Sequence, residues 1–303
     1  MGALGGLLPD ADVLIRSPSD PLLTLEYHRH FTHALAFVPV GGALTAALGR
    51  LISRGKHQAR DLFLPATLGW ATHGLLDTCT SYGTYLLWPF SSARLAWHNI
   101  SIVDPLLTLP LLLGVMLAAI RRNRRLGQVA LGWAVAVLLF GVVQRERAEQ
   151  VYREFIASRG HDPAIVEVKP SLGNNILFRG FYAHDGSYWA DAVRVPWWGE
   201  ARVYQGAQAP TLDWERVTEG LDPLHVRDLE RFAYFSNGYL IHDPIELGMI
   251  ADFRYAILPN SVAPMWGVDL GGAKPGEHLQ FRRYTKTTPP VRAAFMDQLL
   301  GRP

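Results

Sequence analysis

Histidine and aspartate side chains recur at four separate places within the first 104 residues of the 303-residue chain. The candidates are Asp10, Asp12, His28, His33, His73, Asp77 and Asp104. Imidazole and carboxylate groups are ordinary ligands of zinc, manganese and iron, and carboxylates brought together repel one another unless a cation lies between them. Seven candidates exceed what one tetrahedral ion needs. The pattern therefore predicts two divalent metal ions, or one ion with a catalytic base and residues that orient its ligands.

Taken singly, these residues have plainer interpretations. Asp10 and Asp12 suit a helix cap, and His73 suits a hydrogen-bonded interior histidine. Asp104 precedes a proline, as an N-cap with proline at the first helical position would. His30 falls between two better-placed histidines and is expected at the surface. Only the conjunction of these residues favours a metal site.

Four stretches around these residues are apolar enough, or nearly so, to cross a bilayer, which takes about 20 mostly apolar residues. They are residues 31–48, 62–80, 102–120 and 126–143. The first two are weaker because each contains polar or charged side chains. The alternative is a large soluble helical core, and the distribution of basic residues decides against it.

Basic residues occupy two loops that are separated by two of these stretches. They are Arg50, Arg54, Lys56 and Arg60 in one loop and Arg121, Arg122, Arg124 and Arg125 in the other. The intervening loop, 81–101, has one arginine and no lysine. This is the positive-inside pattern, which predicts that both basic loops are cytoplasmic. Residues 9–30, 81–101 and everything after residue 143 are then expected outside.

That topology brings the candidate residues to one side of the membrane. His28 and His33 lie at the outer entrance of the first stretch, and Asp104 opens the third stretch from the outer side. His73 and Asp77 are four residues apart, so they share one helix face, toward the outer end of the second stretch. Ionisable groups at membrane depth are costly and tend to mark functional sites. The topology thus predicts one polar site at the outer face.

Four motifs carry these residues. They are LPDADVL at 8–14, YHRHFTHAL at 27–35, HGLLDTCTSYGTYLLWPFS at 73–91 and ISIVDPLLTLPLL at 100–112. In this order and spacing they resemble the family of membrane-bound metal-dependent hydrolases, one branch of which is described as LexA-regulated and inner-membrane-associated. The resemblance covers roughly residues 1–145.

The resemblance implies a bacterial inner-membrane hydrolase that uses a divalent metal, zinc or manganese, held by all seven candidate residues. Arg29, Thr32, Ser81 and Tyr82 belong to the same motifs. The family is also distantly similar to zinc-dependent phospholipase C-like helical enzymes, which implies a phosphodiester substrate. Its members usually begin with an additional apolar helix. Met1 enters at the end of that helix, so either the start is assigned too late or this member has lost the helix.

The C-terminal half has a globular composition. Helices are expected at 144–159, 223–235 and 290–300, a hairpin at 175–195 around Asp185-Gly186, and strands at 249–258 and 278–285. Asp252 and Arg254 are interpreted as a structural pair. The expected fold is an α-helical multi-pass membrane domain at 1–145, followed by a small α+β soluble, extracytoplasmic domain at 146–303.

The predicted activity is attack of metal-activated water on an ester or phosphoester of a small molecule or lipid, with Asp104 or Asp12 as base. A non-enzymatic metal-binding membrane protein for transport, sensing or scaffolding is the alternative. A transporter would hold its ligands near the bilayer midplane, and an intramembrane metalloprotease would show a His-Glu-x-x-His motif, which this sequence lacks.

The single cysteine, Cys79, excludes an intrachain disulfide and a cysteine-rich zinc site. The sequence has no lysine- and arginine-rich run with interleaved aromatic residues, the pattern that would indicate nucleic-acid binding. It does not specify the oligomeric state.

Overall fold

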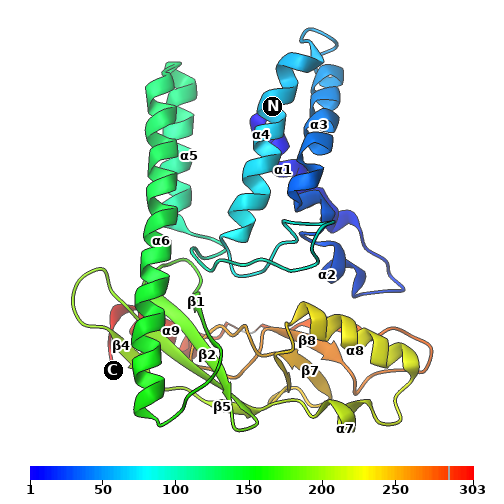
Figure 1. Ribbon diagram of the computed structural model, residues 1–303, viewed down its shortest axis with the longest axis vertical. Helices are drawn as coiled ribbons and strands as arrows, with labels where there is room; N and C mark the ends of the chain where they lie inside the picture. The colour runs from blue at the N-terminus through cyan, green and yellow to red at the C-terminus, as the bar shows by residue number, and fades with distance from the viewer. Residues whose placement is uncertain (286) are drawn as a thin grey trace. The chain divides into compact units, whose positions relative to one another are not determined.

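The computed structural model describes residues 1–285 and 287–303 and divides into two compact units, 1–97 and 98–303 (Figure 1). The first unit is built from helices and loops. The second combines a helical hairpin with two antiparallel sheets. The expected domain division between residues 145 and 146 falls inside one continuous helix of the second unit, α6 (Arg124–Ser158).

The first unit consists of short helical turns followed by two longer helices. Its elements are α1 (Gly2–Leu7), η1 (Leu8–Leu14), α2 (Leu23–Tyr27), η2 (Phe31–His33), η3 (Leu35–Phe37), α3 (Val38–Ile52) and α4 (Ala59–Thr78). α4 packs against both α1 and α3. The loop after α4 returns to the earlier segments, where Tyr85 donates its backbone N–H to the carbonyl oxygen of Arg29 over 3.0 Å.

Glycines allow the helices of this unit to approach closely. A Cβ atom at Gly41 of α3 would enter the ring of Trp70 on α4, and one at Gly69 of α4 would collide with the backbone of α1 at Gly2. The Trp70 indole N–H donates to the Thr45 hydroxyl across the same α3–α4 contact over 2.8 Å. Small residues therefore fix how near α1 and α3 lie to the helix that carries His73.

The second unit begins with the hairpin of α5 (Pro105–Arg121) and α6, which lie side by side in Figure 1. Strands β1 (Val166–Pro170), β2 (Leu177–His184), β3 (Ser187–Arg194) and β4 (Arg202–Tyr204) form one sheet in that order, and β5 (Gln208–Pro210) also pairs with β3. Strands β6 (Leu240–His242), β7 (Met249–Asp252), β8 (Trp266–Asp269) and β9 (Gln280–Arg283) form the other sheet. The remaining helices are α7 (Trp214–Thr218), α8 (Pro223–Phe235) and α9 (Pro289–Leu300).

The last turns of α6 form the core of this unit with the first sheet. Tyr152 and Ile156 of α6 pack against Phe178 and Tyr182 of β2, all at most 2% exposed. A second apolar cluster, which includes Phe181 and residues of β6 and β7, lies between the two sheets. Burial of these aromatic and aliphatic side chains removes much apolar surface from water and so ties α6 firmly to the sheets.

Several features expected of the C-terminal half are confirmed. The β2–β3 hairpin turns at Asp185 and Gly186, whose φ angles of 47° and 68° are those of a two-residue hairpin turn. α8 has the expected bounds, and α9 begins one residue earlier than expected. Asp252 and Arg254 form a buried ion pair at 2.8 Å. The expected strands at 249–258 and 278–285 are shorter, at residues 249–252 and 280–283.

Among the residues that the structure describes, two helical stretches are long and apolar enough to cross a membrane. They are Leu35–Ile52, which contains α3, and the stretch within α6, while α5 is a shorter apolar helix. α4 does not reach the same hydropathy, because Arg60, Asp61, His73 and Asp77 lie within its 20 residues. The N-terminal part of the chain is therefore a helical region with two candidate spans, followed by a C-terminal region of antiparallel sheets and helices.

Candidate metal centre

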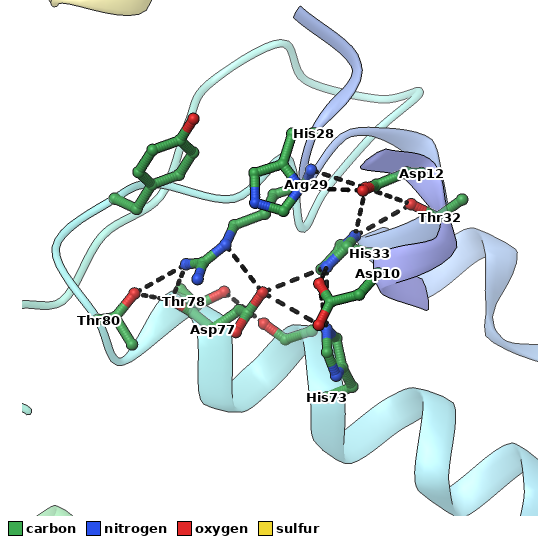
Figure 2. A network of polar contacts seen from close by, with 12 residues as sticks. Asp10, Asp12, His28, Arg29, Thr32, His33, His73, Asp77, Thr78 and Thr80 are labelled. Atoms are coloured by element: carbon green, nitrogen blue, oxygen red, sulfur yellow. Dashed lines mark hydrogen bonds and ion pairs between the residues drawn. The ribbon is translucent and has the colours of Figure 1, made fainter. Parts of the chain in front are cut away.

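Three segments of the first unit present the polar side chains toward one another (Figure 2). Asp10 and Asp12 are two residues apart in the 3₁₀ helix η1, and a helix with three residues per turn points such neighbours in different directions. Asp10 therefore lies toward His73, and Asp12 lies toward His28. His73 and Asp77 share one face of α4, as their spacing predicts.

Four donor atoms converge on one point. They are Asp10 Oδ1, His33 Nε2, His73 Nε2 and Asp77 Oδ2, which all lie within 4.8 Å of one another. The two Nε2 atoms are 3.0 Å apart, and His33 Nε2 is 3.2 Å from the Asp77 oxygen. Three further separations, from Asp10 Oδ1 to each Nε2 atom and from His73 Nε2 to Asp77 Oδ2, are each 3.5 Å.

These separations suit a small tetrahedral ion. Nitrogen and oxygen ligands lie about 2.0–2.1 Å from zinc, so the edges of their tetrahedron measure about 3.3–3.4 Å. These five separations, which range from 3.0 to 3.5 Å, bracket that length. Two imidazole nitrogens and two carboxylate oxygens are also a normal donor set for zinc or manganese. The residues present therefore fit a divalent metal.

The ring orientations of the two histidines also agree with metal ligation. His73 Nδ1 lies 2.7 Å from the carbonyl oxygen of Gly6, which can only accept, so this nitrogen carries the proton. His33 Nδ1 lies 3.2 Å from Asp12 Oδ2 and 3.0 Å from the Thr32 hydroxyl. With the protons held at Nδ1, the lone pairs of both Nε2 atoms face the common point. Metal-binding histidines are commonly oriented by a carboxylate or a carbonyl in this way.

Asp12 is a buried hub beside the donor set, and its side chain is fully inaccessible to solvent. Its Oδ1 accepts from His28 Nδ1 at 2.9 Å. Its Oδ2 accepts from the backbone N–H of Arg29 at 2.8 Å and from the Thr32 hydroxyl at 3.0 Å, besides His33. Both oxygens are thus occupied within the protein.

Arg29 closes the other side of the cluster. Its φ angle of 62° is left-handed, and its Nε lies 3.0 Å from Asp77 Oδ2. Its Nη1 donates to the Thr80 hydroxyl at 2.8 Å, and the guanidinium lies 5.1 Å from the centre of the Tyr82 ring. Three carboxylates and one guanidinium leave two negative charges when the histidines are neutral, a charge that one divalent cation balances.

The carboxylates and histidines of the cluster shift one another's pKa values. The neighbouring rings of His33 and then His73 hold the pKa of Asp10 well below its usual range. Burial raises the pKa of Asp12, but hydrogen bonds with His28 and His33 outweigh it, so the pKa of Asp12 is lowered. Burial lowers the pKa of His33, yet Asp10, Asp12 and Asp77 together raise it to about 10. In the metal-free protein a proton on His33 therefore offsets part of the negative charge.

A second group of possible ligands adjoins the first. Asp10, Asp12 and His28 also offer atoms within 4.8 Å of one another. Asp10 belongs to both groups, so the arrangement allows a pair of ions to share it. Because both oxygens of Asp12 already have donors, this second group is poorer in free ligand atoms than the first.

The structure gathers six of the seven candidates, and the seventh lies in the second unit. There, Asp104 Oδ1 accepts from the backbone N–H groups of Leu106 and Leu107 at 2.9 and 3.2 Å, as an N-cap does. Its other oxygen is buried and has no hydrogen-bond partner among the described residues. Metal binding by the six, and any role of Asp104 beyond the cap, stay predictions.

Two contributors to the cluster were not among the candidates, and His30 is not placed as expected. The Gly6 carbonyl gives no side-chain signal, and Thr80 is one of several hydroxyls after α4. His30, expected at the surface, is half-buried, with its ring centre 4.5 Å from that of Tyr85 and 5.6 Å from that of Trp88. It belongs to neither group of possible ligands among the described residues.

The contact between α1 and α4 provides a test of how His73 is oriented. In Gly69→Ala the new methyl group would collide with the α1 backbone, which carries the Gly6 carbonyl. Loss of that hydrogen bond should lower metal affinity about 10–100-fold, as loss of an orienting partner typically does. Competition with a chromophoric chelator measures the change. The matched control is Gly132→Ala in α6, where the methyl group meets no atom within 4 Å. Equal affinities for the two variants would contradict this role of α1.

Comparison with known proteins finds similarity in the N-terminal part of the chain. Residues 1–148 match the family model described as YdjM inner membrane protein. Over 95 residues the chain is 37% identical to the inner membrane protein YbcI of Escherichia coli (strain K12), which covers 31% of this chain and 54% of that protein. The chain thus spans about half the length of that curated relative. No solved structure matches.

Proposed function

We propose that this chain is an inner-membrane hydrolase of esters or phosphoesters, because residues 1–148 match the YdjM inner membrane protein family and their motifs resemble those of membrane-bound metal-dependent hydrolases. The observation that carries the proposal is the near-tetrahedral set of Asp10, His33, His73 and Asp77. A divalent zinc or manganese ion bound there supplies a Lewis acid and activates water.

The surrounding residues take separate roles in this proposal. Asp12 is a positioning residue, since both of its oxygens are occupied by donors that fix His28 and His33. Arg29 pairs with Asp77 and limits the negative charge. Asp10 is the most accessible of the four, with half of its side chain exposed, so the substrate approaches from its side. Asp104 stays the proposed base.

The distribution of basic residues supports a membrane arrangement for this hydrolase. The proposal has α3, α4, α5 and α6 as four spans, with both arginine-rich loops in the cytoplasm. The Asp/His cluster and the C-terminal region then lie on the outer side of the inner membrane. The substrate is a small molecule or a lipid that reaches this side.

A second candidate function rests on the number of protein ligands. Structural zinc sites are closed by four protein ligands, whereas catalytic sites keep one position open. Four donors converge here, so the alternative is a non-enzymatic membrane protein that binds metal for transport, sensing or scaffolding. The exposure of Asp10 favours the enzyme, because it leaves this side of the donor set open to a substrate.

Metal content tests the proposal. We expect detergent-purified protein reconstituted with zinc or manganese to hold stoichiometric metal and to hydrolyse a chromogenic phosphodiester or ester. His73→Ala should lose both, because it removes one of the four donors. The control is His57→Ala, an exposed histidine in the loop before α4. If His73→Ala loses its metal but the metal-loaded wild type hydrolyses neither substrate class, the result would favour the non-enzymatic alternative. Absence of metal from the folded wild type would overturn both.

A further inference from the structure

Exposed apolar side chains from three separate segments of the second unit gather beside one level of α6. Ile102 and Val103 precede α5, Leu172 lies between β1 and β2, and Trp197 and Trp198 follow β3. Trp198 is 83% exposed, Leu172 66%, Val103 58% and Ile102 54%. We call these five residues the interface belt. Leaving side chains of this size in water is unfavourable, and such exposed apolar groups commonly mark an interaction surface.

Hydrogen bonds fix the level of the belt along α6. The Gln144 amide of α6 donates to the carbonyl oxygens of Asn175 and Val195 at 2.9 and 3.1 Å. Asn175 Oδ1 in turn accepts from the Trp197 indole N–H at 3.0 Å, and the Trp197 ring packs against that of Phe140 at 5.7 Å. The belt loops are thus held next to residues 140–144 of α6.

The segment before α5 is held at the same level. The backbone of Asn99 touches Gly141 of α6 so closely that no Cβ would fit there. The Ser101 hydroxyl accepts from the backbone N–H of Gly173 at 3.2 Å, which joins the Ile102–Val103 segment to the Leu172 loop. All three segments of the belt therefore meet at the point where the apolar part of α6 ends.

The distance from the belt to the far end of the hairpin matches a bilayer. From Arg124 to Gln144 a helix rises about 30 Å, and the hydrocarbon core of a bilayer is about 30 Å thick. The hairpin turn at the far end holds Arg121, Arg122, Arg124 and Arg125. Between the two ends α5 and α6 expose aliphatic side chains such as Leu109 and Leu139, both 63% exposed.

We propose that the interface belt inserts into the headgroup and glycerol region of the phospholipid bilayer and seats the C-terminal sheets directly on the membrane surface. Tryptophan is enriched at this depth, because its ring is apolar and its indole N–H is polar. Lipid is the expected partner of the interface belt, because the belt continues the apolar surface of α6, a helix that already carries a candidate span. The proposal does not depend on hydrolysis or on bound metal.

Spin-label accessibility tests this placement in the full chain. Trp198→Cys and, independently, Leu172→Cys are labelled and reconstituted in nanodiscs of phosphatidylethanolamine and phosphatidylglycerol. The matched control is Asp185→Cys at the β2–β3 turn, where the carboxylate-bearing side chain is 89% exposed. β2 leads away from the belt along α6, with Gly180 packed on Tyr152. The native Cys79 is 6% exposed, so labelled wild type measures its small background.

We expect the ratio of oxygen to nickel-chelate collisions to be several-fold higher at positions 198 and 172 than at position 185, because oxygen partitions into lipid and the chelate stays in water. A ratio at both belt positions equal to that at position 185 would show an aqueous loop and overturn the proposal. Low collision rates with both reagents at both positions would show cover by protein and would overturn it as well. Labelling at two independent positions guards against a variant that misfolds.

Discussion

Asp12→Ala is expected to destabilise the first unit strongly, although Asp12 is not one of the four residues whose ligand atoms converge on the candidate metal position. Four donors point at its carboxylate, namely the Arg29 N–H, the Thr32 hydroxyl and the Nδ1 groups of His28 and His33. A buried donor left without its partner costs about 1–3 kcal/mol. If two of the four find no new partner, the loss is about 2–6 kcal/mol, a large share of the stability of a domain.

Thermal denaturation of the metal-free protein in detergent measures this effect. The matched comparison is Asp10→Ala, since half of the Asp10 side chain is exposed and its loss leaves fewer groups unsatisfied. In protein that stays folded, Asp12→Ala should also lower metal affinity about 10–100-fold, because His33 loses an orienting partner. A melting temperature no lower than that of Asp10→Ala would remove Asp12 from the role of buried hub.

Metal affinity is expected to rise steeply with pH through the neutral range. The pKa of His33 is raised to about 10 in the metal-free protein, so this ring is protonated at neutral pH. A metal binds only the neutral ring and must displace that proton. Affinity should therefore increase about tenfold for each pH unit up to about 10, and the contribution of His33 should level off above that pH.

Calorimetric titration in two buffers of different ionisation enthalpy counts the protons released. At pH 7 we expect His33 to release about one proton for each metal bound. Asp10→Asn removes one of the carboxylates that raise the pKa of His33, so its affinity should fall and should level off at a lower pH than that of the wild type. A wild type that binds metal with no net proton release between pH 7 and 8 would contradict the assignment of this proton to His33.

Local sequence patterns predicted the parts of the fold that depend on local interactions. The β2–β3 hairpin was foreseen because Asp185 and Gly186 adopt left-handed φ angles easily. The expected bounds of α8 match the structure, in which Asp222 caps the start of a helix whose first residue is proline. Three-residue strands such as β4 and β6 were not predicted, because they are too short for an alternating pattern.

The candidate site was predictable in composition and less so in the roles of its members. The four-residue spacing of His73 and Asp77 placed both on one helix face. No pattern distinguishes a carboxylate that faces the donor point from one that orients a ligand, and Asp10 and Asp12 differ only in their direction from a 3₁₀ helix. The sequence allowed Asp104 to be either a site residue or a helix N-cap, and the described contacts show the N-cap.

The origin of the four convergent donors has a consequence for chain entropy. They come from residues 10, 33, 73 and 77, so an ion bound by all four joins three segments that are distant along the chain. Such a joint closes loops that the unfolded chain would otherwise sample freely, and that constraint favours the folded state. With one cysteine in the whole chain, the metal would be the sole staple in a region otherwise held by noncovalent packing alone.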